Sequence, residues 1–411
     1  MEECILAKTL LILGAGPDQL PGIKKANAMG ITTIALDGNP DAIGQTSVDY
    51  FYPVNIKCYA DIEIFVLTQL THKIDGVIAF GVDIPYIIAR TASLLKVNYT
   101  ITDDVAKMSE DKFLSKEFMN NIDINIPPYQ KIKLNHEIDA FIQAHGFPII
   151  IKPVDNSAAR GISYVTHKCD IEQAVAEAFT HTKQDHILVE KYLNGPQIST
   201  ESLVVDGIIH NIGFADRNYA DMDRFFPSII EDGGDLPSLY MSEQYKQILE
   251  QQLTTLCHRL AIKNGVIKGD LVIHNNQLFI IEFALRLSGG NFSTIEIPES
   301  TGIDFIALAI KLHLNEKVAD DELIHTKNEH ISLRYKFNED SQSGIIKEII
   351  FPKQHDAILL QTFHAKRGQI INSKTTDHSK RLGFVIAKGE SRELAINNAQ
   401  QQLKNIRLIL D

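Results

Sequence analysis

The sequence has few cysteines and no pattern that would join them. Its 411 residues include four, Cys4, Cys58, Cys169 and Cys257, which lie far apart and form no CxxC pair. Such spacing favours neither a disulfide framework nor a zinc site. We therefore expect buried, reduced thiols in a cytoplasmic protein.

Long apolar runs are also missing. A membrane helix needs roughly 18 or more uninterrupted apolar residues. The best candidate, residues 84–95, is short and is broken by Arg90. The first residues, MEECILAK, lack the basic start and apolar centre of a secretory signal. We expect no membrane attachment.

Positive charge is in deficit. The 40 basic residues are outnumbered by 52 acidic ones, and the net charge of -12 argues against binding to nucleic acids or anionic membranes. A local basic cleft is compatible with this balance. The apolar content of 44% and the length predict a globular protein of about two or three domains.

Strand-like and helix-like segments alternate in the first hundred residues. Apolar strands are expected at 9–14, 32–37 and 75–80, with helical segments between them. This alternation predicts a parallel sheet that is covered by helices.

A glycine turn follows the first of these strands. Gly14 and Gly16, with Asp37 at the end of the next strand, resemble the fingerprint of dinucleotide-binding domains. Gln19 occupies the third glycine position, however, and Pro17 disturbs the helix start. A dinucleotide-dependent oxidoreductase is therefore kept only as an alternative.

Two acids interrupt neighbouring apolar strands, Asp270 in GVIKGDLVIH and Glu282 in QLFIIEFA. A hairpin with a three-residue loop at 275–277 sets the acids opposite each other, whereas a two-residue loop sets Asp270 opposite Ile281. Opposed carboxylates destabilise a sheet unless a cation lies between them. Oxygen ligands favour Mg²⁺ or Mn²⁺. The alternative is a separate salt bridge for each acid.

Two further segments suit a nucleotide. Lys152 ends the apolar run 147–151 and precedes a loop of small residues, DNSAARG (155–161), whose backbone N–H groups could approach a phosphate. The strand in HILVEKYLNGPQ ends near a Gly-Pro turn, which exposes backbone groups that could pair with an adenine edge. A solvated lysine and an ordinary strand exit are the plainer interpretations.

The order of these segments resembles the ATP-grasp superfamily of carboxylate ligases. The matching segments are SEDKF, FPIIIKP, LVEKYLNGPQIS, GVIKGDLVI, IIEFALR and TGIDFIALAI. The start is similar to a pre-ATP-grasp domain, and RLGFVIAKGESRELAINNA to the C-terminal segment of the amino-acid-ligase and biotin-carboxylase-like branch. The resemblance implies an α/β fold with three parts. These are a Rossmann-like domain at 1–103, an ATP-grasp domain at 104–318 with a small αβ lid at about 135–195, and an α+β segment at 319–411.

The resemblance also implies roles for individual residues. The metal carboxylates would be Asp270 and Glu282, and Arg286 and Arg334 would stabilise an acyl-phosphate or bind the substrate carboxylate. Gln197 lies where the family often has a ribose-binding glutamate. The implied ATP-binding residues are Lys112, Lys152, Ser157, Gly161, Glu190, Lys191, Leu193 and Gln197.

One position departs from the family pattern. The metal strand of the family frequently reads ExNxR, and Ala284 stands where the asparagine ligand would be. Alanine offers no ligand, so water or both oxygens of Glu282 would have to complete the metal shell.

The implied activity is that of an ATP-dependent, ADP-forming carboxylate–amine ligase, which forms an amide or peptide bond through an acyl-phosphate. Its cofactors would be ATP and Mg²⁺ (or Mn²⁺), and its partners a small-molecule carboxylate and an amine, with amino-acid-like substrates favoured. The stretch 215–237, with Arg217, Arg224, Phe225 and Phe226, is expected near the substrate. The resemblance leaves a homodimer open.

Two alternatives share the nucleotide site. The same residues would serve a carboxylase that phosphorylates bicarbonate, of the biotin carboxylase or purine-pathway type. A regulator that binds ATP without turnover is the other, and Ala284 is its main support.

Overall fold

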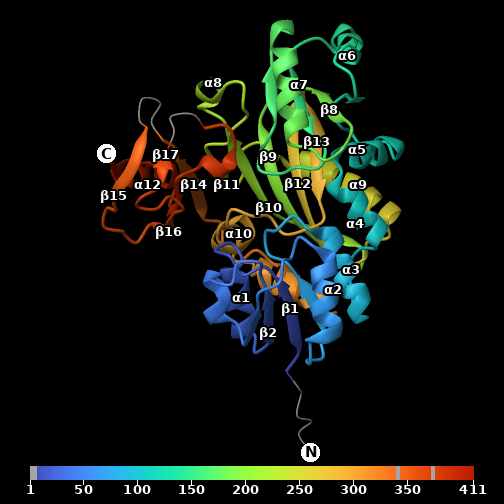
Figure 1. The fold of residues 1–411 in the computed structure, drawn as a ribbon, viewed down its shortest axis with the longest axis vertical. Helices are drawn as coiled ribbons and strands as arrows, with labels where there is room; N and C mark the ends of the chain where they lie inside the picture. The colour runs from blue at the N-terminus through green and yellow to red at the C-terminus, as the bar shows by residue number, and fades with distance from the viewer. Residues whose placement is uncertain (1–6, 339–342, 372–374) are drawn as a thin grey trace, which may run out of the picture.

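The computed structural model describes residues 7–338, 343–371 and 375–411. Figure 1 shows the N-terminal sheet at the bottom, a small lid at the top and the C-terminal segment at the left, with helices α4, α5 and α9 along the right side. Within the described ranges, no helix is both long and apolar enough to span a membrane.

The N-terminal part is a four-stranded parallel sheet with the order β3-β2-β1-β4, as the alternation predicted. Its strands β1, β2 and β4 are mostly apolar and buried, as expected of a parallel sheet that helices cover on both faces. The strands are β1 (Thr9–Leu13), β2 (Thr32–Leu36), β3 (Tyr50–Tyr52) and β4 (Gly76–Ile78). The helices are α1 (Leu20–Ala28), α2 (Tyr59–Thr68) and α3 (Pro85–Leu95).

The glycine turn of this part is filled by a side chain. Gln19 accepts a hydrogen bond from the backbone N–H of Gly16 at 3.0 Å and donates one to the carbonyl of Phe80 at 2.7 Å. A Cβ atom added at Gly14 would lie 3.1 Å from the Gln19 side chain. The space in which a dinucleotide would approach the backbone is therefore occupied, which argues against the oxidoreductase alternative.

The lid is a four-stranded antiparallel sheet with the order β5-β8-β6-β7 and one helix-covered face. Its first strand begins at Tyr129, before the predicted lid boundary at about 135. The strands are β5 (Tyr129–Ile132), β6 (Ile149–Pro153), β7 (Ser163–Val165) and β8 (Ile187–Lys191), and the helices are α6 (Glu137–His145) and α7 (Ile171–Thr180).

The central sheet has eight strands in the order β13-β12-β9-β10-β11-β14-β18-β16. Three of them come from the predicted C-terminal segment, which therefore continues this sheet. The strands are β9 (Gln197–Val205), β10 (Ile208–Asn218), β11 (Gly233–Leu236), β12 (Gly265–His274), β13 (Gln277–Ala284), β14 (His330–Lys336), β16 (Ile358–Phe363) and β18 (Gly383–Gly389). We propose the same three-part division, with β14, β16 and β18 shared between the last two parts.

Helices and a small second sheet complete the fold. The sheet has the order β17-β15-β19. Its strands are β15 (Gly344–Ile350), β17 (Ile370–Ile371) and β19 (Arg407–Leu410). The remaining helices are α4 (Asp103–Glu110), α5 (Lys112–Asn121), α8 (Met222–Phe225), α9 (Glu243–Leu260), α10 (Ile297–Thr301), α11 (Phe305–His313) and α12 (Arg392–Asn405).

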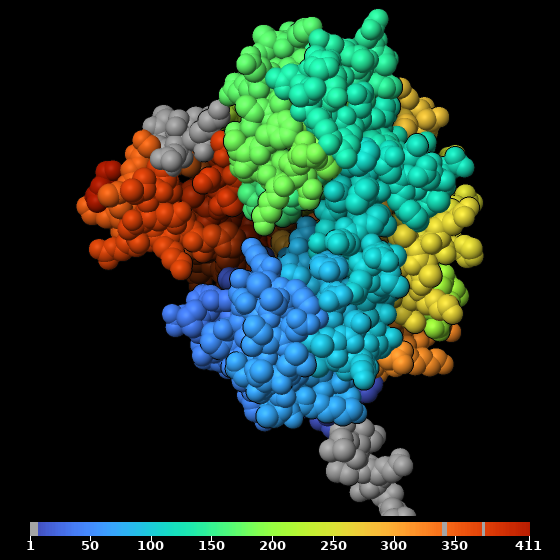
Figure 2. Space-filling model, turned by 45° about the vertical axis from the view of Figure 1, so that its right-hand side comes forward, coloured from blue at the N-terminus to red at the C-terminus, as the bar shows by residue number. Residues whose placement is uncertain are grey.

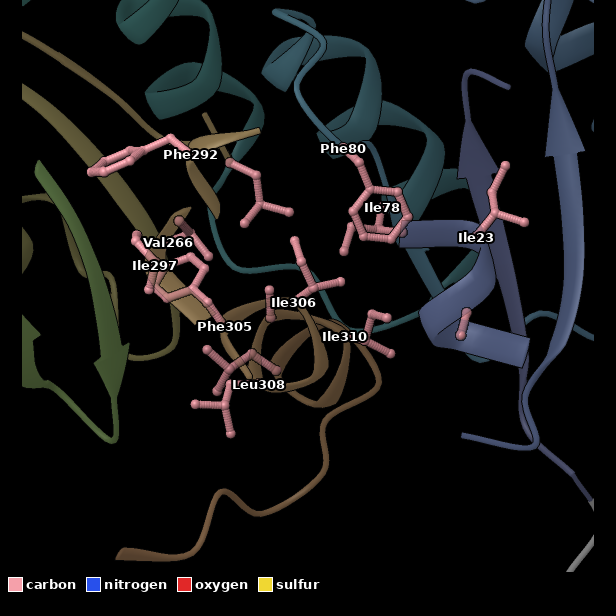
Figure 3. Packing of buried hydrophobic residues seen from close by; sticks show 14 of the residues in the cluster. Ile23, Ile78, Phe80, Val266, Phe292, Ile297, Phe305, Ile306, Leu308 and Ile310 are labelled. Atoms are coloured by element: carbon pink, nitrogen blue, oxygen red, sulfur yellow. The ribbon is translucent and has the colours of Figure 1, made fainter. Parts of the chain in front are cut away.

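One apolar cluster joins the N-terminal and central sheets through α11. Figure 3 shows Phe305, Ile306 and Ile310 of this helix between Ile78 and Val266. Each fully buried side chain of this kind contributes about 1.5–3 kcal/mol. The two sheets are thus held as one packed unit, which fixes the cleft between them.

The cysteines only partly match the expectation. Cys257 is buried, and its burial raises the pKa of the thiol to about 12. Cys58 is half-buried and Cys169 is exposed, so the expectation of buried thiols was wrong for these two. Cys4 lies outside the described residues.

Candidate active site

A large cleft lies where the three parts of the chain meet. Its volume is about 1300 Å³, and it is lined by residues of the N-terminal sheet, the lid, the central sheet and the C-terminal segment. Figure 2 shows this hollow between the green lid, the blue N-terminal part and the orange C-terminal segment.

The hairpin of β12 and β13 places two acids at the cleft wall. Asp270 pairs with Glu282, as predicted, but the predicted three-residue loop was wrong. Asn275 and Asn276 form a two-residue turn with φ of 49° and 59°, the left-handed geometry of a tight hairpin. A bulge leaves Ile281 unpaired, and this extra residue restores the register that the shorter loop would have lost.

Asp270 is surrounded by cations. Its carboxylate lies 2.6 Å from Lys268 Nζ and 3.4 Å from an Arg217 nitrogen, and it accepts a hydrogen bond from the Ser199 hydroxyl at 3.2 Å. Burial would raise the pKa of Asp270, but Lys268 and Arg217 outweigh it and hold this pKa well below its usual range. Asp270 is therefore ionised, as a metal ligand must be.

The donor set at the hairpin suits a magnesium ion. Two carboxylates face the cleft, and magnesium commonly takes one or two carboxylates together with phosphate oxygens. In the described part of the chain, no group of three or more acidic, histidine or cysteine side chains could hold a metal. Asp270 and Glu282 are the predicted ligands that line the cleft.

Lys268 was missed by the sequence analysis. It pairs directly with Ala284 across the hairpin, and its ammonium contacts Asp270. The spacing in the strand could have predicted its place next to Asp270, because residues two apart in a strand lie on the same face. A positive charge thus stands beside the position that lacks the asparagine ligand.

Lys112 links the hairpin to the small-residue loop. Its Nζ donates to the carbonyl of Asn156 at 2.7 Å and lies 3.7 Å from the Glu282 carboxylate. Asp111 caps helix α5 by accepting from the backbone N–H groups of Phe113 and Leu114, which fixes where Lys112 begins the helix.

A buried lysine pair surrounds Glu190. Its carboxylate lies 2.6 Å from Lys152 Nζ and 3.2 Å from Lys116 Nζ, and all three side chains are almost fully buried. Burial would raise the pKa of Glu190, but the two lysines hold it below its usual value. The carboxylate is therefore committed to the lysines, and only the backbone of Glu190 can serve the predicted adenine slot.

Lys116 was also missed by the sequence analysis. Its ammonium donates to the carbonyl of the bulged residue Ile281 at 3.0 Å. Burial lowers the pKa of Lys116 to about 8. Its ammonium group therefore loses its proton at a lower pH than that of an ordinary lysine.

An apolar slot lies at the end of β8. Of the predicted residues, Lys191, Leu193 and Gln197 line it. The backbone N–H of Leu193 has no hydrogen-bond partner within the described residues. Other lining side chains are Pro127, Ile150, Tyr192, Val272 and Ile281. A flat aromatic ring with a hydrogen-bonding edge would suit this slot.

The loop 155–161 is partly as predicted. Ser157 lines the cleft, whereas Gly161 lies outside its lining and packs against His181, where a Cβ atom would come within 2.8 Å of the histidine Cβ. The carbonyl of Ala158 accepts a hydrogen bond from the backbone N–H of His378 at 3.1 Å. The C-terminal segment thus holds this loop over the cleft.

The two predicted catalytic arginines have different surroundings. Arg286 lines the cleft and is oriented by Asp83 of the N-terminal part, at 2.8 Å from its Nε. Arg334 is buried and forms two hydrogen bonds with Asp235, at 2.9 and 3.0 Å. It does not line the cleft, which argues against its predicted role.

The predicted side chains of the stretch 215–237 also differ in whether they reach the cleft. Arg217 reaches the cleft, where it lies 2.9 Å from the Glu231 carboxylate. Arg224 lies over the Phe225 ring, and Phe225 packs in a separate apolar cluster. Phe226 is partly exposed and lies edge-on to the Tyr164 ring. Of the four predicted side chains, only Arg217 lines the cleft.

The fold and the cleft define the class of protein: an ATP-grasp fold, with a lid sheet over an antiparallel sheet and paired acids at the cleft wall. The family model for the carbamoyl-phosphate synthase L chain, ATP binding domain, matches residues 111–320, just over half of the chain. The chain belongs to this family.

Comparisons with known proteins agree with this assignment. The carbamoyl phosphate synthase large chain of Thermomicrobium roseum is 22% identical over 335 residues, which cover 75% of this chain. The chain spans only about 30% of the length of that relative.

Solved structures show the same fold over nearly the whole chain. An L-amino acid ligase from Bacillus licheniformis has a TM-score of 0.80 at 18% identity, covering 98% of this chain and 99% of that one. The biotin carboxylase domain of the 2-oxoglutarate carboxylase from Hydrogenobacter thermophilus, in complex with MgADP and bicarbonate, has a TM-score of 0.76 at 17% identity. It covers 98% of this chain and 91% of that one.

Proposed function

We propose that this chain is an ATP-dependent, ADP-forming ligase that joins a carboxylate to an amine through an acyl-phosphate. The observation that carries the proposal is one cleft in which Asp270 and Glu282 oppose each other beside Lys112 and Lys152. Membership of a family of ATP-binding domains supports the nucleotide, and the amino acid ligase of the same fold supports the chemistry.

Different residues of the cleft would bind the adenine, the ribose and the phosphates of ATP. The apolar slot with Leu193 would take the adenine, and Gln197 the ribose. Lys112, Lys152 and the backbone at Ser157 would bind phosphate oxygens, since ammonium groups and backbone N–H groups compensate their charge. Little covalent chemistry falls to the protein in phosphoryl transfer, so alignment and charge compensation would account for most of the rate.

A magnesium ion, when bound at Asp270 and Glu282, would supply charge neutralisation for the phosphates. Lys268 would compensate further negative charge beside Ala284, because its ammonium already contacts Asp270. Arg286, which Asp83 orients, would stabilise the charge on the acyl-phosphate. Manganese is the second ion that this donor set would accept.

An ADP-release screen tests the proposal. Purified protein with ATP and Mg²⁺ is offered amino acids singly and in pairs, together with small carboxylates. We expect ADP and phosphate in equal amounts with a subset of pairs. Release that needs no carboxylate, or none with any pair, would contradict the proposal.

A second candidate is a carboxylase that phosphorylates bicarbonate. It is favoured by the matching biotin carboxylase domain, whose structure holds MgADP and bicarbonate. ADP release that rises with bicarbonate and needs no amino acid would select this candidate.

The setting of the enzyme is part of the proposal. We infer small-molecule substrates and a cytoplasmic location. The biotin carboxylase domain of the same fold was solved as a dimer, which supports a homodimer here. Light scattering on the purified chain would test this assembly.

A further inference from the structure

One acidic side chain in the cleft has no partner. Glu296 ends the helical turn at 292–296, directly before α10, and it is only 2% exposed. It lines the cleft, yet no hydrogen bond or ion pair holds its carboxyl group within the described ranges. A buried polar group normally has a hydrogen-bond partner, so an unpartnered carboxyl group at the cleft wall is available to a ligand.

The surroundings of Glu296 are acidic. Burial and the neighbouring carboxylates Glu231, Asp235 and Glu201 raise the pKa of Glu296 well above its usual value. Arg334 is the cation that opposes this shift, but its guanidinium is committed to Asp235. The carboxyl group of Glu296 is therefore neutral by itself, and the positive charge of a bound ligand would favour its ionised form.

The opposite charge lies close by. Arg217 bridges the carboxylates of Glu231 and Asp270, at 2.9 and 3.4 Å. Arg381 donates a hydrogen bond to the backbone carbonyl of Glu231 at 2.6 Å and lies over the Tyr335 ring at 3.5 Å. The Nε atoms of both arginines are buried without a hydrogen-bond partner in the described part of the chain. These two guanidinium groups could bind a carboxylate, a geometry that arginine favours.

We propose that Glu296 binds the ammonium group of the amine substrate, and that Arg217 and Arg381 bind a carboxylate of the same molecule. The amine acceptor is then an amino acid. This inference rests on the proposed ligase function and names one of its substrates. Arg217 connects the two regions, since it contacts both Glu231 beside Glu296 and the predicted metal ligand Asp270.

Glu296 is also suited to take a proton. The ammonium charge favours the ionised carboxylate, which accepts one proton from the substrate nitrogen. The nitrogen then attacks the acyl carbon, the new C–N bond forms, and the bond from the acyl carbon to the phosphate oxygen breaks. The second proton leaves with the phosphate, so the products are the amide and hydrogen phosphate.

The variant Glu296→Gln tests this role, because it keeps the size of the side chain and removes its charge. Glu299→Gln is the matched control: this residue lies three positions later, outside the cleft, 3.6 Å from Lys327. Calorimetry measures binding of the twenty amino acids in the presence of MgADP. The best binder is then compared with its methyl ester and its N-acetyl derivative.

We expect binding of the amino acid to weaken at least roughly tenfold in Glu296→Gln and to stay unchanged in Glu299→Gln. The N-acetyl derivative should bind poorly to the wild type, and the methyl ester should lose affinity through the arginines. Equal binding by wild type and Glu296→Gln, or no amino-acid binding by the wild type, would overturn the inference.

A second measurement separates this inference from the ligase proposal. Hydroxylamine traps an acyl-phosphate and needs no ammonium site. The rate of ADP release with hydroxylamine should therefore be the same within about twofold in Glu296→Gln and the wild type, whereas the rate with the amino acid falls in the variant. If hydroxylamine gives no ADP with any carboxylate in the wild type, the ligase proposal fails. The calorimetric result then still decides the role of Glu296.

Discussion

Two turns of this chain look suited to a phosphate, and the structure separates them. The turn at Gly14 and Gly16 has the better glycine pattern, but the Gln19 side chain fills it. The loop 155–161 has one glycine, yet Lys112 donates a hydrogen bond to its backbone and the loop faces an open cleft. Free space and nearby cations, rather than glycine count, distinguish the site.

The largest expected effect is on the acid pair. Glu282→Ala should lower ADP release by at least about a hundredfold, because it removes a preorganised contact to the transition-state charge. Asp37→Asn, in the N-terminal turn, should leave the rate within about twofold. Steady-state ADP release measures both, with circular dichroism to show that the fold is kept. Equal losses in the two variants would remove the distinction between the turns.

The next effect concerns phosphate binding. Lys152→Met should raise the KM for ATP on the order of tenfold or more, because a buried ammonium in the cleft is lost. Lys24→Met, on the exposed face of the helix after the glycine turn, is the control and should leave this KM unchanged. An unchanged KM in Lys152→Met would place the phosphates elsewhere.

A smaller effect should appear with pH. Above the Lys116 pKa of about 8 its ammonium becomes neutral, and Glu190 then holds Lys152 more tightly. We expect the KM for ATP to rise a few-fold, on the order of 0.5–1 kcal/mol, between pH 7 and pH 9. Lys116→Met should abolish this dependence, and the exposed Lys404→Met should retain it.

Unfolding of the protein at high pH would not explain this rise in the KM for ATP. The folded pKa of Lys116 lies below its ordinary value of 10.5, so its contribution to stability rises as pH increases from about 8 towards 10.5. Thermal unfolding measured across this pH range would show whether stability rises with pH, as this argument expects. A KM that is flat with pH in the wild type would mean that Lys116 does not act on Lys152.

The smallest effect on activity is expected at the N-terminal turn. Gln19→Ala leaves the buried carbonyl of Phe80 without its donor, which should cost about 1–3 kcal/mol of stability. Urea unfolding measures this loss. The KM for ATP should stay within about twofold, and no NAD(H) affinity should appear. Tight NAD(H) binding would revive the oxidoreductase interpretation.

The register of the hairpin shows how far the sequence could be read. The opposition of Asp270 and Glu282 was predicted from a three-residue loop, and it is present for a different reason. Hydrophobic alternation specifies which face is buried, but it does not reveal a bulge, because one unpaired residue at Ile281 looks like any other apolar residue. The prediction was right in its pairing and wrong in its turn.

The arginines show where local patterns fail. Arg286 and Arg334 both follow apolar residues in strand-like segments, and the resemblance gave them the same role. Their partners, Asp83 and Asp235, are distant in sequence, and only the packing of the sheets brings one pair to the cleft and buries the other. No spacing rule in the chain carries that information.

The sequence by itself determined the alternating N-terminal sheet, the two apolar strands that carry Asp270 and Glu282, and the order of segments that identifies the fold, because each depends on short-range patterns of apolar and charged residues. The tertiary structure decided that Gln19 fills the glycine turn, that Lys116 and Lys152 enclose Glu190, and that Glu296 faces the cleft alone. These outcomes depend on contacts between distant elements, whose geometry is set by how the sheets and α11 pack.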